Sequence, residues 1–186
     1  RIAAVRRYKS PGRLLDVGGG TGELLVEALR AGFEALGIDL SPDMARYVFN
    51  RYGIQVFCGD ISQFRTNEPF DVILMSHVIE HVFDPVELLC HVKTLLKEEG
   101  ILYIATPNIA CWEARWDGWA SYEPYHVTYF SPKTLRDALQ RSGYIVLNMY
   151  TEAPLSSLVQ YVSPEYPEKS LSEGTLGGPS GPAGEI

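Results

Sequence analysis

The sequence has little positive charge. Its 186 residues include 16 Lys and Arg against 23 Asp and Glu, which gives a formal net charge of −7 at pH 7. Proteins that bind the phosphate backbone of nucleic acids carry a basic patch or stripe that neutralises the phosphates. The acidic balance therefore argues against a nucleic acid as a partner.

Cysteine is also scarce, and long apolar runs are missing. The three cysteines, Cys58, Cys90 and Cys111, stand far apart without a C-x-x-C pair, which argues against a disulfide framework or a zinc site. They fit a reducing compartment, so we expect a cytoplasmic protein. No apolar run reaches the roughly 20 residues of a membrane span, and no signal peptide opens the sequence. Because the first residue is Arg1 rather than Met, we expect that an N-terminal piece is missing.

The chain divides into an ordered body and a tail. Residues 1–152 hold the apolar runs that a packed core needs, and we expect them to form one domain. Gly, Pro and Ser make up almost half of residues 153–186, a composition typical of a flexible extension. Within this tail, the pattern of residues 154–162 allows a short helix.

Strand-like and helix-like segments alternate along the body. Short apolar runs predict strands, and apolar residues that recur on one helical face predict helices. The expected strands are 13–18, 34–40, 55–59, 70–76, 100–108 and 144–150, and the expected helices are 23–32, 41–52, 85–97 and 131–142. This alternation is typical of an α/β protein with a Rossmann-like, doubly wound, mostly parallel sheet that helices cover on both faces. Ligands of such sheets bind beyond the carboxyl ends of the strands.

Four glycines crowd the turn after the first expected strand. Their spacing is D-x-G-x-G-x-G, made by Asp16, Gly18, Gly20 and Gly22, with Gly19 as the fourth glycine. Glycines at a strand-to-helix turn permit positive φ and let the backbone approach a ligand, so we favour a ligand site over a simple tight turn. A dinucleotide-binding G-x-G-x-x-G pattern would need glycine where Glu23 stands, and no G-K-[ST] ending of a phosphate-binding loop follows.

This spacing resembles the first motif of class I S-adenosylmethionine-dependent methyltransferases, and later segments follow that family's order. They are GIDLSPDM at 37–44, CGDI at 58–61, FDVILMSHVIEHVFDP at 70–85 and LLKEEGILYIATPN at 95–108. The resemblance covers roughly residues 12 to 145. The stretch EPYHVTYFSPKTL at 123–135 is similar to a subgroup with ubiquinone-biosynthesis-like and other small-molecule methyltransferases. It implies methyl transfer to a small-molecule acceptor, and we expect O-methylation, while the residues alone leave C- and N-methylation open.

The resemblance implies S-adenosylmethionine as the cofactor, together with a set of contacts to it. Asp39 would accept hydrogen bonds from both ribose hydroxyls, for which an ionised carboxylate has the capacity. Asp60 would bind the adenine amino group while Ile61 packs on the ring. The other residues implied in cofactor binding are Asp16, which would orient the glycine loop, and Gly18, Gly19, Gly20, Gly22, Leu40, Ser76 and His77. On the residues alone, Asp39 could instead be a surface acid before a helix cap, and Asp60 could be ordinary turn chemistry.

The segment SHVIEHV, residues 76–82, permits two interpretations. His77, Glu80 and His81 would share one face of a helix, and two imidazoles with a carboxylate could bind a divalent metal. Some ubiquinone-pathway methyltransferases, which the segment resembles, use a metal with an E-x-x-E-H pattern here, but His77 replaces the first acid. We therefore expect no metal. His77 would instead line the cofactor pocket, and Glu80 and His81 would form a local hydrogen-bonded pair.

Residues 112–130 are rich in aromatic side chains, namely Trp112, Trp116, Trp119, Tyr122, Tyr125, Tyr129 and Phe130. Because the segment follows the fifth expected strand, it should overhang the mouth of the pocket. It could form a lid and acceptor-binding wall, a small satellite core under a long loop, or both. His126 and His81 are the candidate catalytic bases for a hydroxyl acceptor, although His126 could instead pin the loop by hydrogen bonds.

Two other functions stay open from the sequence. An NAD(P)-dependent oxidoreductase could use a similar sheet, although the glycine spacing and Asp60 count against it. A non-catalytic module could bind the cofactor as a sensor or support a partner subunit, and only a turnover assay would distinguish it from an enzyme.

Overall fold

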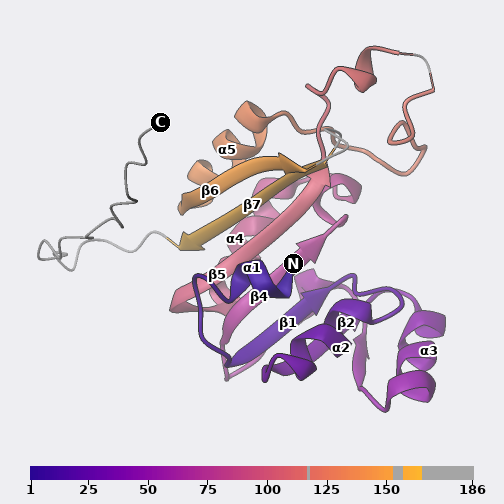
Figure 1. Cartoon of the computed structure of the whole chain (residues 1–186), viewed down its shortest axis with the longest axis vertical. Coiled ribbons are helices and arrows are strands. Elements are labelled where there is room, and N and C mark those ends of the chain that lie inside the picture. The colour runs from indigo at the N-terminus through magenta and orange to yellow at the C-terminus, as the bar shows by residue number, and fades with distance from the viewer. Residues whose placement is uncertain (117, 153–156, 165–186) are drawn as a thin grey trace, which may run out of the picture.

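The protein is built around a single mixed β-sheet. A computed structural model describes residues 1–116, 118–152 and 157–164. The strands are β1 (Arg13–Val17), β2 (Glu34–Asp39), β3 (Val56–Cys58), β4 (Phe70–Ser76), β5 (Leu96–Pro107), β6 (Tyr144–Glu152) and β7 (Ser157–Pro164). They form one sheet in the order β3-β2-β1-β4-β5-β7-β6 (Figure 1). Strands β1 to β5 pair in parallel, and β7 runs antiparallel to both of its neighbours.

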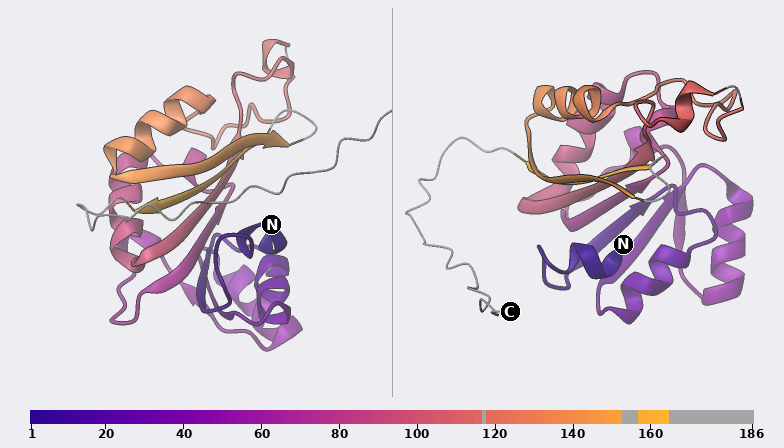
Figure 2. Two further views of the ribbon diagram at one scale, coloured as in Figure 1. Left: turned by 60° about the vertical axis from the view of Figure 1, so that its left-hand side comes forward. Right: turned by 45° about the horizontal axis from the view of Figure 1, so that its top comes forward.

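Helices cover both faces of this sheet (Figure 2). One face carries α1 (Ile2–Val5), α2 (Glu23–Arg30) and α3 (Pro42–Tyr52), and the other carries α4 (Pro85–Leu95) and α5 (Pro132–Arg141). Three short 3-10 turns connect these elements: η1 (Ile61–Gln63), η2 (Ile79–His81) and η3 (Glu113–Arg115). The predicted Rossmann-like α/β fold is confirmed.

The central strands are apolar on both sides, and their side chains alternate between two cores. Leu14, Val72, Leu74 and Tyr103 pack toward α1 and α2. Their chain neighbours Leu15, Ile73, Met75 and Leu102 pack toward α4 and α5. Three helices begin at side-chain caps: Ser41, Asp84 and Ser131 accept hydrogen bonds from first-turn amides, and each is followed by proline.

The C-terminal part of the sheet differs from the expectation. The short helix expected within residues 154–162 is wrong for the described part, because Ser157–Pro164 form β7. This strand pairs with β5 over Leu102–Pro107 and with β6. The sheet therefore continues past residue 152, where we expected the extension to begin. The rest of that predicted extension, residues 153–156 and 165–186, lies outside the described residues.

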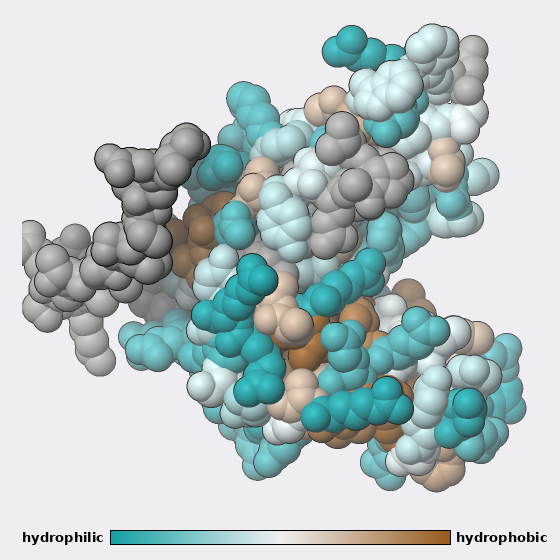
Figure 3. All heavy atoms as spheres, viewed as in Figure 1, coloured by the Kyte–Doolittle hydropathy of each residue, from teal (hydrophilic) through white to brown (hydrophobic). Residues whose placement is uncertain are grey.

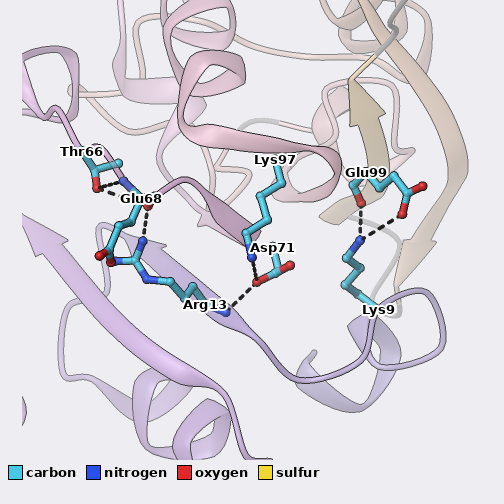
Figure 4. Close-up of polar contacts among 7 residues, drawn as sticks. All are labelled: Lys9, Arg13, Thr66, Glu68, Asp71, Lys97 and Glu99. Atoms are coloured by element: carbon cyan, nitrogen blue, oxygen red, sulfur yellow. Dashed lines mark hydrogen bonds and ion pairs between the residues drawn. The ribbon is translucent and has the colours of Figure 1, made fainter. Parts of the chain in front are cut away.

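Polar contacts tie the N-terminal segment to the amino-terminal edge of the sheet (Figure 4). The ammonium of Lys9 donates to the carbonyl oxygen of Glu99 over 2.7 Å. Asp71 Oδ2 accepts from the Arg13 amide at 2.8 Å and from Lys97 Nζ at 2.7 Å. Burial alone would raise the pKa of Asp71, but these donors hold the pKa below its usual value. The contacts lie at the edge opposite to the carboxyl ends of the strands.

One face of the surface is shown in Figure 3. On the face shown in Figure 3, polar side chains predominate and apolar ones show in patches between them. In the described ranges, none of the helices combines the length and the apolar character that crossing a membrane requires.

Candidate active site

A cavity of about 480 Å³ opens at the carboxyl ends of the parallel strands. Its lining follows the ends of β1 (Val17, Gly18), β2 (Ile38, Asp39, Leu40), β3 (Gly59, Asp60, Ile61) and β4 (His77, Val78, His81, Val82, Phe83). The chain crosses from β3 on one side of β1 to β4 on the other, so the cavity lies at the topological switch point of the sheet. This is where open α/β sheets bind their ligands.

The glycine turn between β1 and α2 forms one wall of the cavity. Gly18 has a φ of +67°, and a Cβ atom there would lie 2.7 Å from the Val78 side chain. Gly20 has a φ of +50°, and its amide donates a hydrogen bond to Asp39 Oδ2 at 3.0 Å. Both positions need a backbone conformation that residues with a side chain rarely adopt. The turn is thereby fixed to the end of β2.

Two acids stand at the ends of neighbouring strands. Asp39 accepts from the Ser41 amide with Oδ1 at 2.8 Å and from the Gly20 amide with Oδ2 at 3.0 Å. Each carboxylate oxygen has two lone pairs, so each retains capacity for a ligand hydroxyl. Asp60 caps η1 by accepting from the Ser62 amide, and it is exposed at the cavity.

Apolar side chains lie between and beside these acids. Ile61 is buried, whereas Leu40 is 73% exposed and Phe83 is 91% exposed. All three line the cavity. Exposed apolar side chains beside carboxylates are suited to a ligand that combines a flat apolar ring with hydroxyl groups.

Asp16 lies beneath the glycine turn as a buried acid. It is 1% exposed, and its Oδ2 has no hydrogen-bond partner among the described residues. Burial raises the pKa of Asp16 to about 7; nearby Arg1 counteracts this rise and Asp39 adds to it. Arg1 reaches the same region, since its Nη1 donates to Ser76 Oγ at 2.8 Å. A buried carboxylate oxygen without a donor fits a site that a ligand's ammonium group would complete.

His77 and Glu80 form the hydrogen-bonded pair of the segment after β4. His77 Nδ1 lies 3.2 Å from Glu80 Oε1, and the hydroxyl of Thr106 donates to Glu80 Oε2 at 2.9 Å. Burial alone would raise the pKa of Glu80, but its donors hold the pKa below the usual value. The expected Glu80–His81 pair is therefore wrong. The reason is local: His77 has a φ of +57° and residues 79–81 form a 3-10 turn, so the α-helical spacing does not apply.

His81 and His126 meet at the edge of the cavity, with ring centroids 4.8 Å apart. Each Nδ1 faces a backbone carbonyl oxygen, of Tyr125 at 3.1 Å for His81 and of Ser121 at 2.8 Å for His126. A carbonyl only accepts, so in the neutral rings Nδ1 carries the proton and Nε2 keeps a lone pair. Burial lowers the pKa of His81, which favours the neutral ring.

Glu80, His81 and His126 also offer ligand atoms within 4.8 Å of one another, a group that could hold a metal ion. Both oxygens of Glu80 are already engaged by His77 and Thr106. Each oxygen keeps a second lone pair, so these hydrogen bonds leave Glu80 able to act as a metal ligand. The expectation that no metal binds stays a prediction.

The aromatic segment forms a small core of its own. Cys111, Ala114 and Trp119 are buried together, with Ile109 and Tyr129 packed against them. The amides of Val127 and Thr128 donate to the carbonyl oxygen of Glu80, which fastens the end of the segment beside the cavity. The satellite-core interpretation is thus correct. A role as an acceptor-binding wall stays a prediction.

The structure brings together only part of the predicted site. The predicted residues that line the cavity are Gly18, Asp39, Leu40, Asp60, Ile61, His77 and His81; those that stand back from it are Asp16, Gly19, Gly20, Gly22, Ser76 and His126. Gly19 packs beside the Asp16 carboxylate, and Gly22 starts α2. The lining also contains residues that sequence reasoning did not assign to the site, among them Val78, Val82 and Phe83. A lone exposed aromatic such as Phe83 carries no spacing signal that could have found it.

A cavity lined by two carboxylates and apolar side chains, at the switch point of a Rossmann-like sheet, is typical of a cofactor-binding α/β domain. Comparison with known families is more specific, because the methyltransferase domain family matches residues 1–148. The chain belongs to the methyltransferase domain family.

Relatives support the same conclusion. The chain is 36% identical over 107 residues to a ubiquinone biosynthesis O-methyltransferase of Actinobacillus pleuropneumoniae, covering 52% of this chain and 46% of that protein. It is 28% identical over 148 residues to the one of Cereibacter sphaeroides, covering 70% and 59%. The chain thus spans about half the length of these curated relatives. An S-adenosylmethionine-dependent methyltransferase from Clostridium acetobutylicum has a similar fold, with a TM-score of 0.69, 16% identity and 88% of each chain covered.

Proposed function

We propose that this protein binds S-adenosylmethionine in the cavity and transfers its methyl group to a hydroxyl of a small-molecule acceptor. The observation that carries the proposal is the placement of Asp39 and Asp60, at the ends of neighbouring strands, in the lining of an apolar cavity beside the glycine turn. Membership of the methyltransferase domain family and the similarity to O-methyltransferases support it.

The residues present fit the cofactor. Asp39 would bind the ribose hydroxyls with its remaining lone pairs, and Asp60 would accept from the adenine amino group. Leu40 and Ile61 would enclose the adenine ring. The methionine end carries an ammonium and a carboxylate, for which the region offers the unpaired Asp16 oxygen and the Arg1 guanidinium. Opposite charges at that end favour a zwitterion.

Methyl transfer to a hydroxyl requires that the acceptor be positioned beside the methyl group and that a base take the hydroxyl proton. When bound, the cofactor supplies an electrophilic methyl group on a sulfonium centre. His81 lines the cavity, and its Nε2 lone pair would take the proton of the acceptor hydroxyl. His126 packs against the His81 ring and would hold it in place, with a second Nε2 lone pair close by. Val78, Val82 and Phe83 would exclude water from the reacting atoms.

The test is methyl transfer from deuterium-labelled S-adenosylmethionine to a panel of acceptors, followed by mass spectrometry. The panel should pair phenols and catechols with anilines of the same ring shape. We expect the labelled methyl group to appear on the hydroxyl groups of the phenols or catechols. We expect His81→Ala to lower turnover by about 100-fold or more, which is the worth of a general base, while S-adenosylhomocysteine binding stays within about twofold. Transfer to anilines alone, or equal losses of turnover and binding, would contradict the proposal.

The other functions considered from the sequence are less well supported. The family match favours methyl transfer over an NAD(P)-dependent oxidoreductase. A non-catalytic cofactor-binding module would show tight binding and no labelled product with any acceptor. A cytoplasmic location stays a prediction, supported by three free cysteines in the described part of the chain.

A further inference from the structure

A second cavity lies in the aromatic segment after β5, which Figures 1 and 2 show projecting beyond the carboxyl ends of the strands. Its volume is about 340 Å³, and its lining is Trp112, Glu113, Trp116, Gly118, Trp119 and Ala120. None of these residues lines the cavity at the ends of β1 to β4. The two cavities therefore share no lining residue among those described, and the argument for the second cavity uses none of the residues proposed for methyl transfer.

Three indole rings shape this second cavity. The rings of Trp112 and Trp116 stand nearly perpendicular, at 87°, with centroids 6.2 Å apart, and form adjoining walls. They are 57% and 64% exposed, although burying large aromatic side chains is favourable. Trp119 is buried, and its ring contacts Tyr122 at 5.1 Å and Tyr129 at 6.4 Å between centroids. The hydroxyl of Tyr122 donates to the Ala114 carbonyl oxygen at 2.9 Å, which braces the loop.

The cavity also carries a negative charge. Glu113 lines it, and its carboxylate interacts with the Cys111 thiol, a weak donor that leaves the buried Glu113 Oε2 without a strong hydrogen-bond donor among the residues that the structure describes. A buried carboxylate oxygen without a donor is costly, and a nearby cation reduces that cost. Aromatic faces attract cations as well, and the attraction is strongest for tryptophan. The indole walls and the charge of Glu113 therefore both favour a cationic ligand.

We propose that this cavity binds a small organic cation whose charge is a quaternary ammonium group. Such a cation is bulky, weakly hydrated and apolar on its surface, so it gains from the indole walls as well as from Glu113. An inorganic cation would keep its water shell and could not use the walls. A neutral molecule of the same shape would gain from the walls alone.

The experiment is a titration of the full chain with choline, followed by intrinsic tryptophan fluorescence. All three tryptophans of the chain line this cavity, so the signal reports on it alone. The matched control ligand is 3,3-dimethyl-1-butanol, which has the shape of choline without the charge. We expect a saturable change with choline and binding at least about tenfold weaker with the alcohol.

Variants tested by calorimetry identify the residues. We expect Glu113→Gln and Trp116→Leu each to weaken choline binding by about fivefold or more, and Trp116→Phe to retain most of it. Glu123→Gln removes a charge from the same segment outside the cavity and should change nothing. Unchanged binding of S-adenosylhomocysteine would show that each variant is folded. Equal binding of choline and the alcohol, no saturation by choline up to about 50 mM, or full binding by Glu113→Gln would overturn the proposal.

Discussion

The substitution Asp16→Asn separates stability from cofactor binding. Asp16 is buried with an unpartnered oxygen among the described residues, and its pKa is raised from 3.8 to about 7. A raised pKa means that the folded protein holds a proton that the unfolded chain releases. The carboxyl therefore costs no stability at low pH. The cost grows as the pH rises from about 4 to 7 and is complete above that range.

The magnitude follows from the pKa. A rise from 3.8 to about 7 corresponds to about 4 kcal/mol of lost unfolding free energy at high pH, and about 2–3 kcal/mol of this falls between pH 5 and pH 8. Asparagine keeps the shape and removes the charge, but its buried amide costs about 1–3 kcal/mol. We expect Asp16→Asn to be more stable than the native protein at pH 8 by about 1–3 kcal/mol. The unfolding free energy of the variant should also not show the fall between pH 5 and pH 8 that Asp16 causes in the native protein.

Urea denaturation at pH 5 and pH 8 measures this effect, and calorimetry with S-adenosylhomocysteine measures the cost in binding. We expect about tenfold weaker binding, because the ammonium of the ligand loses its anion. Asp43→Asn is the matched control on the exposed surface of α3 and should change neither quantity by much. Native and variant proteins with the same pH dependence, or a variant that is less stable at pH 8, would refute the reasoning.

Three further changes test other parts of the structure. Asp39→Ala should weaken S-adenosylhomocysteine binding by more than about tenfold in calorimetry, since it removes the ribose acceptor and frees the Gly20 amide; unchanged binding would remove Asp39 from the site. Asp71→Asn should lower the unfolding free energy at pH 7 by about 1 kcal/mol, because it removes the ion pair between Asp71 and Lys97. The effect is small because Lys97 is half-exposed and solvent screens the pair. The pKa of Asp71 is lowered in the folded state, so this difference should disappear as the pH falls below its ordinary value near 4. EDTA should leave methyl transfer unchanged, and an activity restored only by a divalent metal would show that the Glu80, His81 and His126 group binds one.

Local sequence signals predicted the parallel half of the sheet well. The glycine turn, the caps at Ser41 and Ser131 and the apolar run of β4 each act over a few residues, so the pattern determines the structure directly. The acids at the ends of β2 and β3 then followed from the rule that parallel strands end at one edge.

The features that sequence reasoning missed depend on contacts between distant residues. Strand β7 is defined by pairing with β5 and β6 rather than by its own Ser- and Pro-containing sequence. The His77–Glu80 pair depends on a positive φ at His77 that no residue pattern announces. Phe83 reaches the cavity only because the chain turns sharply after β4, and its exposure leaves no periodic signal.

The most direct test of the central claim is calorimetric titration of the full chain with S-adenosylhomocysteine and S-adenosylmethionine, with NADH as the control. The structure predicts one site per chain for both sulfur ligands, no binding of NADH, and loss of the site in Asp39→Ala. Binding of NADH in their place, or binding of the sulfur ligands that Asp39→Ala leaves intact, would contradict the assignment of this cavity.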